Sequence, residues 1–200
     1  YEGKYYVSFP PFPSYVLLPF ALVFGEQTPD NLLAFLVMLL VVCYAAEIAI
    51  HFRLSEFSCV FFAVFLYVSN NLWQITVDSW VWFFAQNLSF TLSLMAFYHA
   101  LSGQKGRAYF FLAAAVGCRP FQVLYLPVIC ILLYRKQAGR DFRDKMKRFL
   151  WKKPCSYLPA AVLALSYLGL NLLRFGDPFE FGHNYLPEFT YSEQGQFSLQ

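Results

Sequence analysis

The sequence predicts an all-α fold: a multi-pass transmembrane helical bundle of about six crossings plus a short re-entrant or interfacial helix. The first observation is composition, because 58% of the 200 residues are hydrophobic and 14% are charged, against about 45–50% and about 25% in soluble domains. The second is the recurrence of apolar segments of roughly the 20-residue length that crosses a bilayer. The third is that basic residues gather in alternate loops, as they do on the cytoplasmic side of membrane proteins.

We expect residues 1–200 to form a single transmembrane domain. Because the chain begins at Tyr1 and not at a methionine, we also expect it to be an internal fragment of a longer protein. Residues 1–30 are interpreted as the remnant of an outer loop that includes the short apolar stretch Tyr15–Phe24. A helix of about 10 residues is about 15 Å long, half of the hydrocarbon thickness, so this stretch is expected to stay at the outer interface.

The helical spans are assigned to residues 31–173. Pro29 and Asp30 are expected to supply the turn and the N-cap of the first span. The second span is the shortest, and it is expected to borrow flanking residues to cross the bilayer. Four spans follow directly from apolar segments: Asn31–Ile50, Phe57–Val68, Trp80–Leu101 and Ser156–Leu173.

The segment Ala108–Tyr134 can be interpreted in two ways. Its roughly 27 residues would make about 40 Å of helix, so it forms either one long kinked helix or two shorter passes with a turn at Arg119-Pro120. Charge favours two passes. A single pass would put Lys105 and Arg107 on the opposite side from the basic run of the next loop, whereas two passes place both on the cytoplasmic side.

Residues 135–154 are interpreted as a cytoplasmic basic loop, with nine Lys or Arg residues against Asp141 and Asp144. Within it, Phe142–Trp151 has the pattern of a basic amphipathic helix that lies on anionic lipid head groups. Residues 174–200 are interpreted as the start of an outer loop. This topology places 12 of the 15 Lys and Arg residues in the cytoplasm, and the exceptions are Lys4, Arg119 and Arg174.

The catalytic motifs of soluble enzymes do not occur in the sequence, which has no GxSxG, P-loop, HExxH or GxGxxG pattern. The five cysteines are an odd number without a CxxC pair, so neither a disulfide framework nor a metal site is predicted. His51 and His99 fall at the cytoplasmic ends of spans, where we expect interfacial roles.

Polar and aromatic candidates remain in four segments, all expected on the outer face. Each has a structural alternative. The aromatic residues of the first segment are alternatively anchors before a helix that starts with proline, and Arg119 of the second snorkels to head groups. The third, after Asn171, is alternatively a loop held by its own charge pairs, and Asp78 of the fourth is a helix N-cap. Cations suit phosphate and aromatic rings suit sugars. We therefore expect a substrate with a lipid tail, a phosphate and a sugar, bound by Lys4, Tyr5, Tyr6, Arg119, Arg174, Glu180 and His183, with Asp78 as a weak catalytic candidate.

These segments carry a family resemblance. Gly3-Lys4-Tyr5-Tyr6 followed by Phe9-Pro10-Pro11 resembles the Gly-x-x-Tyr…Pro-Pro element of the GT-C membrane glycosyltransferases. That superfamily includes the protein O-mannosyltransferases and the lipid A aminoarabinose transferases. Three further stretches resemble its elements in order and spacing: a short apolar helix ending in Phe24-Gly25, a basic residue and proline at Arg119-Pro120, and Asn171–Gly182.

The resemblance implies a glycosyltransferase that moves a sugar from a polyprenyl-phosphate carrier to a glycan, lipid or protein acceptor. It implies an inverting reaction, in which an acidic side chain is the base and cations or a divalent metal stabilise the leaving phosphate. A divalent metal is the one cofactor that the resemblance leaves open. It also implies an integral protein of the bacterial plasma membrane, with an extracytoplasmic active face, membrane lipids around it and no nucleic-acid partner.

Two departures from the superfamily pattern matter. Its main acidic residue would fall before Tyr1, so the catalytic base is expected outside this chain, which alone is expected to be inactive. The lysine that aminoarabinose transferases carry just before the Pro-Pro pair is Phe9 here. Two other classes stay open: a membrane transporter or lipid flippase, and a non-catalytic scaffold. Transporters often contain internal repeats, and the sequence shows none.

Overall fold

A computed structural model describes residues 10–69, 71–78, 81–138, 141–151 and 153–180. Within these residues the chain is helical and contains no strand, which confirms the all-α fold. The elements in chain order are α1 (Phe12–Phe24), η1 (Gly25–Gln27), α2 (Asp30–His51), α3 (Glu56–Val68), α4 (Leu72–Val77), α5 (Val81–Leu101), α6 (Lys105–Val116), η2 (Pro120–Tyr125), α7 (Leu126–Arg135), α8 (Phe142–Trp151), η3 (Pro154–Tyr157) and α9 (Leu158–Phe175).

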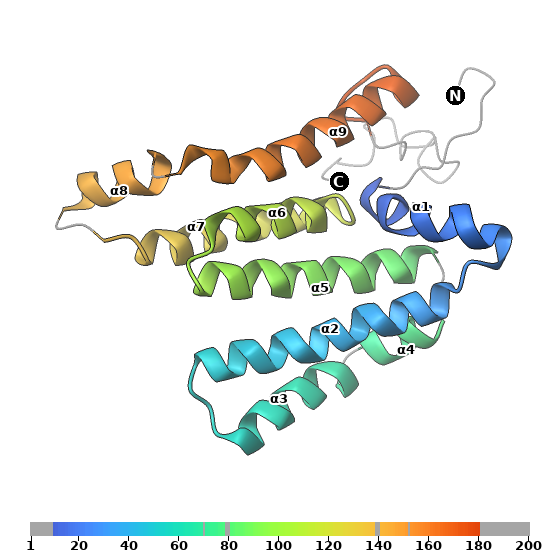
Figure 1. Cartoon of the computed structure of the whole chain (residues 1–200), viewed down its shortest axis with the longest axis horizontal. Coiled ribbons are helices and arrows are strands. Elements are labelled where there is room, and N and C mark those ends of the chain that lie inside the picture. Colours follow the sequence, from blue (N-terminus) through green and yellow to red (C-terminus); the bar gives the residue numbers. More distant parts are fainter. Residues whose placement is uncertain (1–9, 70, 79–80, 139–140, 152, 181–200) are drawn as a thin grey trace, which may run out of the picture.

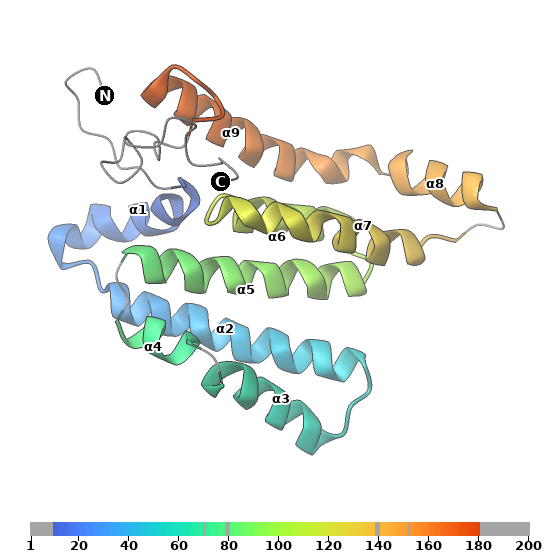
Figure 2. The ribbon, with the colours of Figure 1, turned by 180° about the vertical axis from the view of Figure 1, so that it is seen from behind.

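The helices form a row of roughly aligned rods, in which the neighbours α5 and α6 are antiparallel whereas α2 and α5, and likewise α6 and α9, run in the same direction (Figure 1). α5 lies between α2 and α6, and α9 packs against α6 on the side away from α5. α3 and α4 cover the outer side of α2, whereas α7 runs back beside α6 toward α8 (Figure 2). This order leaves the bundle with two distinct ends, one at α1 and the other at the loops that join α5 to α6 and α7 to α8.

Two helical segments in the described part of the chain are long and apolar enough to cross a membrane by length and composition. They are α2 and the continuous segment Pro154–Phe175, which joins η3 to α9. α3 and the segment Pro120–Arg135 are apolar but shorter. The expectation of about six crossings is therefore not confirmed.

The boundaries near α2 and α3 differ from the expected ones. Asp30 is the first helical residue of α2 and the N-cap position is Pro29, which makes no side-chain capping bond, so the expected Asp30 cap is wrong. α3 begins at Glu56, one residue before the expected Phe57. The Ser55 side chain caps it by accepting a hydrogen bond from the Ser58 backbone N–H. It does not extend beyond Val68, and the loop that follows forms the separate short helix α4.

The segment after residue 104 forms two helices and not one long kinked helix. α6 ends at Val116, Arg119 is extended with φ −144°, and η2 leads into α7. α7 returns to the start of α6, because a Cβ placed on Gly103 would lie 3.8 Å from the Cβ of Lys136. The basic residues on both sides of this hairpin therefore meet at one end of the bundle, as charge predicted.

The central helix α5 carries a set of polar side chains that are all buried, namely Asn87, Ser89, Thr91, Ser93 and His99. Asn87 donates from Nδ2 to the Ala34 carbonyl of α2 at 3.1 Å and to the Thr76 hydroxyl of α4 at 3.3 Å. Thr91 donates to the Val37 carbonyl of α2 at 3.4 Å.

Two serines of α5 bond in the other direction. Ser89 donates to the Ala115 carbonyl of α6 at 3.4 Å, and Ser93 donates to the Gln122 side chain of η2 at 3.1 Å. A buried hydroxyl or amide needs such partners, because it has given up its hydrogen bonds to water. These bonds tie α5 to four neighbouring elements.

Apolar side chains lie both inside the bundle and over its outside. Alanines are frequent at the interior helix contacts, beside larger residues such as Phe84 and Ile129, and Ala34, Ala45, Ala100, Ala108 and Ala114 have no exposed surface. Small residues let helix backbones approach closely, as in membrane helix pairs. Further large apolar side chains cover the outside of α2, α3 and α9, including Leu36, Phe57, Phe61, Leu165 and Leu173. An exposed apolar surface this extensive needs an apolar environment.

Replacing Asn87 by alanine is expected to lower the stability of the bundle. The change removes two hydrogen bonds to α2 and α4, each worth about 0.5–1.5 kcal/mol, so we expect a loss of about 1–2 kcal/mol. Thermal unfolding of the detergent-solubilised protein, followed by circular dichroism, measures it. The neighbouring exposed amide gives a matched control, since Gln86→Ala should change stability by less than about 0.5 kcal/mol. Equal losses from both variants would contradict a structural role for Asn87.

Candidate functional site

The Pro10-Pro11 pair begins the described chain at one end of the bundle, and both prolines are buried. Pro11 occupies the N-cap position of α1. The backbone N–H of Phe12 donates to the Gly117 carbonyl at 3.0 Å, so the start of α1 is bonded directly to the end of α6. The expected short helix Tyr15–Phe24 is present as part of α1.

α9 joins this contact through two tyrosines. The rings of Tyr15 and Tyr167 stack with centroids 6.1 Å apart, and the Tyr15 hydroxyl donates to Ser166 at 3.2 Å. The Tyr167 hydroxyl donates to the Ala113 carbonyl of α6 at 3.3 Å. A Cβ on Gly117 would lie 2.3 Å from that hydroxyl. Glycine is therefore required at position 117 for α1, α6 and α9 to meet.

Arg119 lies just beyond this junction, in the turn between α6 and η2. Its Nη2 donates to the Trp82 carbonyl of α5 at 2.9 Å, and the guanidinium lies 5.6 Å from the centroid of the Trp82 ring. Partial burial lowers the pKa of the Arg119 guanidinium, which still remains protonated near neutral pH. Within the described part of the chain, no acidic side chain forms an ion pair with Arg119. The turn thus presents a cation whose charge is not neutralised by those residues.

The end of α9 is followed by a fixed turn. Gly176 caps the helix with a left-handed φ of 72°. The buried Asn171 donates from Nδ2 to the Pro178 carbonyl at 3.1 Å, and Asp177 accepts a hydrogen bond from the Phe179 N–H at 2.8 Å. The expectation of a structured loop after this span is confirmed as far as residue 180.

The acidic and basic candidates near this end occupy different positions. Arg174 lies in the last turn of α9 and Glu180 in the turn that follows, and both are partly buried. Asp78 is exposed at the C-cap of α4, where it accepts a hydrogen bond from Gln74. The alternative role of Asp78, an N-cap before Trp80, involves residues 79 and 80, which lie outside the described residues. Lys4, Tyr5, Tyr6 and His183 lie outside the described residues.

The structure brings together three of the segments that the sequence singled out, the proline pair, the Arg119 turn and the α9 region. Tyr15 and Tyr167 make the contacts of α9 with α1 and α6, and Trp82 of α5 binds Arg119. Sequence reasoning did not select these three residues for the site. Aromatic residues are so frequent in this chain that no single one stands out by type. These three aromatic residues lie on different helices, so the sequence does not show that they meet unless one already knows which helices are neighbours.

The described residues offer no candidate metal site. Among the residues that the structure describes, no group of three or more His, Cys, Asp or Glu side chains could hold an ion.

Comparison with known proteins assigns no family. No family model, no curated protein and no solved structure matches this chain.

Adding a methyl group at Gly117 is expected to separate the three helices that meet there. Gly117→Ala places a Cβ within the Tyr167 side chain, and overpacking of this kind costs about 1–3 kcal/mol. Gly169 of α9 is the matched control, because a Cβ there has nothing within 4 Å. Gly169→Ala should raise stability by about 0.5–1 kcal/mol, as alanine is the better helix former. Thermal unfolding of both variants measures the difference, and a Gly117→Ala variant as stable as the parent would refute the close contact.

Proposed function

We propose that the protein is a glycosyltransferase that moves a sugar from a polyprenyl-phosphate carrier to an acceptor on the extracytoplasmic face of a membrane. The observation that carries the proposal is the junction of α1, α6 and α9. There Phe12, directly after the proline pair, bonds to Gly117, two residues before Arg119, and Tyr15 of α1 bonds to Ser166, five residues before Asn171. Three segments that resemble separate elements of GT-C enzymes are thus joined through residues close to each of them. Segments that form one site must meet in this way.

A membrane arrangement of about six crossings goes with this proposal. In it α2, α3, α5, α6, α7 and α9 cross the bilayer, α1 lies at the outer interface and α8 at the inner one. The large apolar side chains on the outside of α2, α3 and α9 support it. So does the gathering of the basic loops at the end of the bundle away from α1, which follows the positive-inside rule.

The chemistry assigned to this end follows from charge. Cleavage of a sugar–phosphate bond builds negative charge on the departing carrier phosphate, which a fixed cation stabilises. Arg119 is proposed for that role, because the bond to Trp82 orients its guanidinium and no ion pair within the described residues neutralises it. Arg174 and Glu180 are proposed to contact the substrate from the α9 side. A carboxylate outside the described residues would take the proton from the acceptor.

The proposed topology predicts opposite exposure of two cysteines. With the remaining cysteines replaced, a Gln27→Cys variant in η1 should react with a membrane-impermeant maleimide in intact cells. The native Cys155 in η3 should react only after the membrane is opened. Both positions are exposed in the structure, so accessibility to the reagent depends on the side of the membrane. Reaction of both from the same side would overturn the arrangement.

Removal of the Arg119 side chain is expected to abolish most of the activity. In the full-length protein, Arg119→Ala should reduce turnover by more than about 100-fold, equivalent to about 2.7 kcal/mol of transition-state stabilisation. Transfer of a radiolabelled sugar from its polyprenyl-phosphate carrier measures this. Arg143→Ala, at an exposed position on α8, is the control and should change turnover less than about twofold.

The same assay decides between function classes. Release of labelled sugar to an acceptor supports the transferase. Translocation of the intact labelled lipid without cleavage would instead identify a flippase or transporter. If neither transfer nor translocation is observed, the scaffold remains. A well-folded Arg119→Ala variant with unchanged turnover would remove Arg119 from the site.

A further inference from the structure

A hollow of about 620 Å³ lies at the end of the bundle opposite α1. We call it the basic hollow, and four cations line it without any carboxylate. Three of them, Arg107, Lys136 and Lys153, are exposed. Among the described residues none of the four takes part in an ion pair. Its lining comes from three parts of the chain, residues 102–107, residues 136–137, and Lys153 with Ser156.

The walls of the basic hollow are held by specific contacts. Lys105 donates from Nζ to the Phe149 carbonyl of α8 at 2.5 Å and lies 3.9 Å from the centre of the Tyr157 ring. Gly106 lets η3 approach α6, because a Cβ there would lie 3.3 Å from the Ser156 carbonyl. Lys105 therefore holds α6 against α8 and η3. Arg107 donates from Nη1 to the Gln104 side chain at 3.0 Å, and its remaining N–H groups, with Lys136 and Lys153, are left to meet a ligand.

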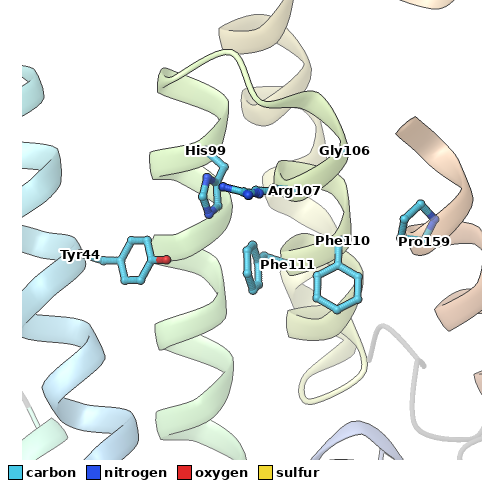
Figure 3. A pocket seen from close by; sticks show the side chains of 7 residues that line it. All are labelled: Tyr44, His99, Gly106, Arg107, Phe110, Phe111 and Pro159. Atoms are coloured by element: carbon cyan, nitrogen blue, oxygen red, sulfur yellow. The ribbon is translucent and has the colours of Figure 1, made fainter. Parts of the chain in front are cut away.

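A second hollow of about 370 Å³ adjoins the first and shares Gly106 and Arg107 with it. We call it the aromatic hollow. Figure 3 shows its side chains, with Arg107 extending toward His99, and with Tyr44 of α2 and Pro159 of α9 on opposite sides. The rest of its lining is apolar, provided by Phe110 and Phe111 of α6.

One residue in the lining of each hollow carries a buried polar atom without a partner. His99 lies in the last turn of α5, is only 5% exposed, and stacks its ring on Phe111 at a centroid distance of 5.2 Å. Its Nδ1 has no hydrogen-bond partner among the described residues, and neither has the buried Oγ of Ser156; the third such atom, Asn87 Oδ1, belongs to neither hollow. Buried polar atoms are rarely left without a partner. A rotation of the His99 or Ser156 side chain would present its free atom to a ligand in the hollow.

We propose that the two hollows form one binding site for an anionic amphiphile, with a phosphate group in the basic hollow and an apolar chain in the aromatic hollow. Basic pockets between membrane helices bind anionic lipid head groups through this combination of charges. The aromatic hollow distinguishes this ligand from a free phosphate, because a free phosphate would contact only the cations of the basic hollow. The site lies at the other end of the bundle from Arg119 and does not depend on the transferase proposal.

Calorimetric titration of the purified protein in nonionic detergent tests the site. The probes are dioctanoyl phosphatidic acid, dioctanoyl phosphatidylcholine and inorganic phosphate. We expect phosphatidic acid to bind most tightly. The variant Lys136→Gln/Lys153→Asn should weaken it by about tenfold or more, because each basic residue near an anionic head group contributes roughly fivefold. Asparagine is chosen for position 153 because the backbone there is left-handed, with φ 66°.

A matched pair on α8 controls for general charge attraction. Arg143→Gln/Lys147→Gln removes the same charge from exposed positions outside both hollows and should weaken binding less than about twofold. Equal weakening by the two pairs would overturn the proposal, since it would show attraction to net charge alone. Thermal unfolding checks that each variant is folded.

A third variant tests the apolar half of the site. Phe110→Ala should lower the affinity for phosphatidic acid by about fivefold, because apolar contact is lost. The affinity for inorganic phosphate should stay unchanged. If inorganic phosphate binds as tightly as phosphatidic acid, the ligand is a soluble phosphate and the amphiphile proposal fails. Tight binding of phosphatidylcholine would equally overturn the role of the cations.

Discussion

The burial of polar side chains on α5 is the constraint on which the rest of the bundle depends. Each amide or hydroxyl on this helix needs a protein partner once it leaves water. The Asn87 amide nitrogen and the Thr91 hydroxyl find theirs on α2 and α4, whereas Ser89 and Ser93 find theirs on α6 and η2. Because these two groups face different neighbours, α5 must lie inside the bundle. Alanines at the helix contacts then allow the neighbouring backbones to come close enough to accept the bonds.

With α5 fixed in the centre, the up-and-down course of the chain separates its chemistry into two ends. The end at α1 holds one partly buried guanidinium, aromatic rings and a close three-helix junction at Gly117. The opposite end holds the exposed cations of the basic hollow beside the aromatic hollow. The first resembles a place where charge is stabilised during a reaction, and the second a place where a charged lipid is held. The same helices position both, so a shift of α6 along its axis would affect the two together.

The sequence predicted the helices better than their contacts. Phe142–Trp151 was predicted with the bounds that α8 has, and the turn at Arg119-Pro120 was predicted between two helices. Apolar runs, prolines and charges are local signals, so they carry this information. The cap expected of Asp30 was wrong, because it depends on the backbone geometry at the helix start, and the burial of His99 against Phe111 was not predicted, because it depends on which helix lies alongside. A usable signal was present in Asn87, Thr91 and His99, whose spacing by multiples of four places them on one side of α5.

The brevity of α6 has a consequence for the surrounding bilayer. α6 has 12 residues and is only about 18 Å long, whereas the returning arm runs through η2 and α7 from Pro120 to Arg135. In the proposed arrangement α6 meets a hydrocarbon layer of about 30 Å. The layer must thin beside it, or head groups must descend to the level of the turn. A carrier lipid diffusing in the plane of the membrane would then be drawn to this place by hydrophobic mismatch, and its phosphate would reach Arg119 without leaving the leaflet.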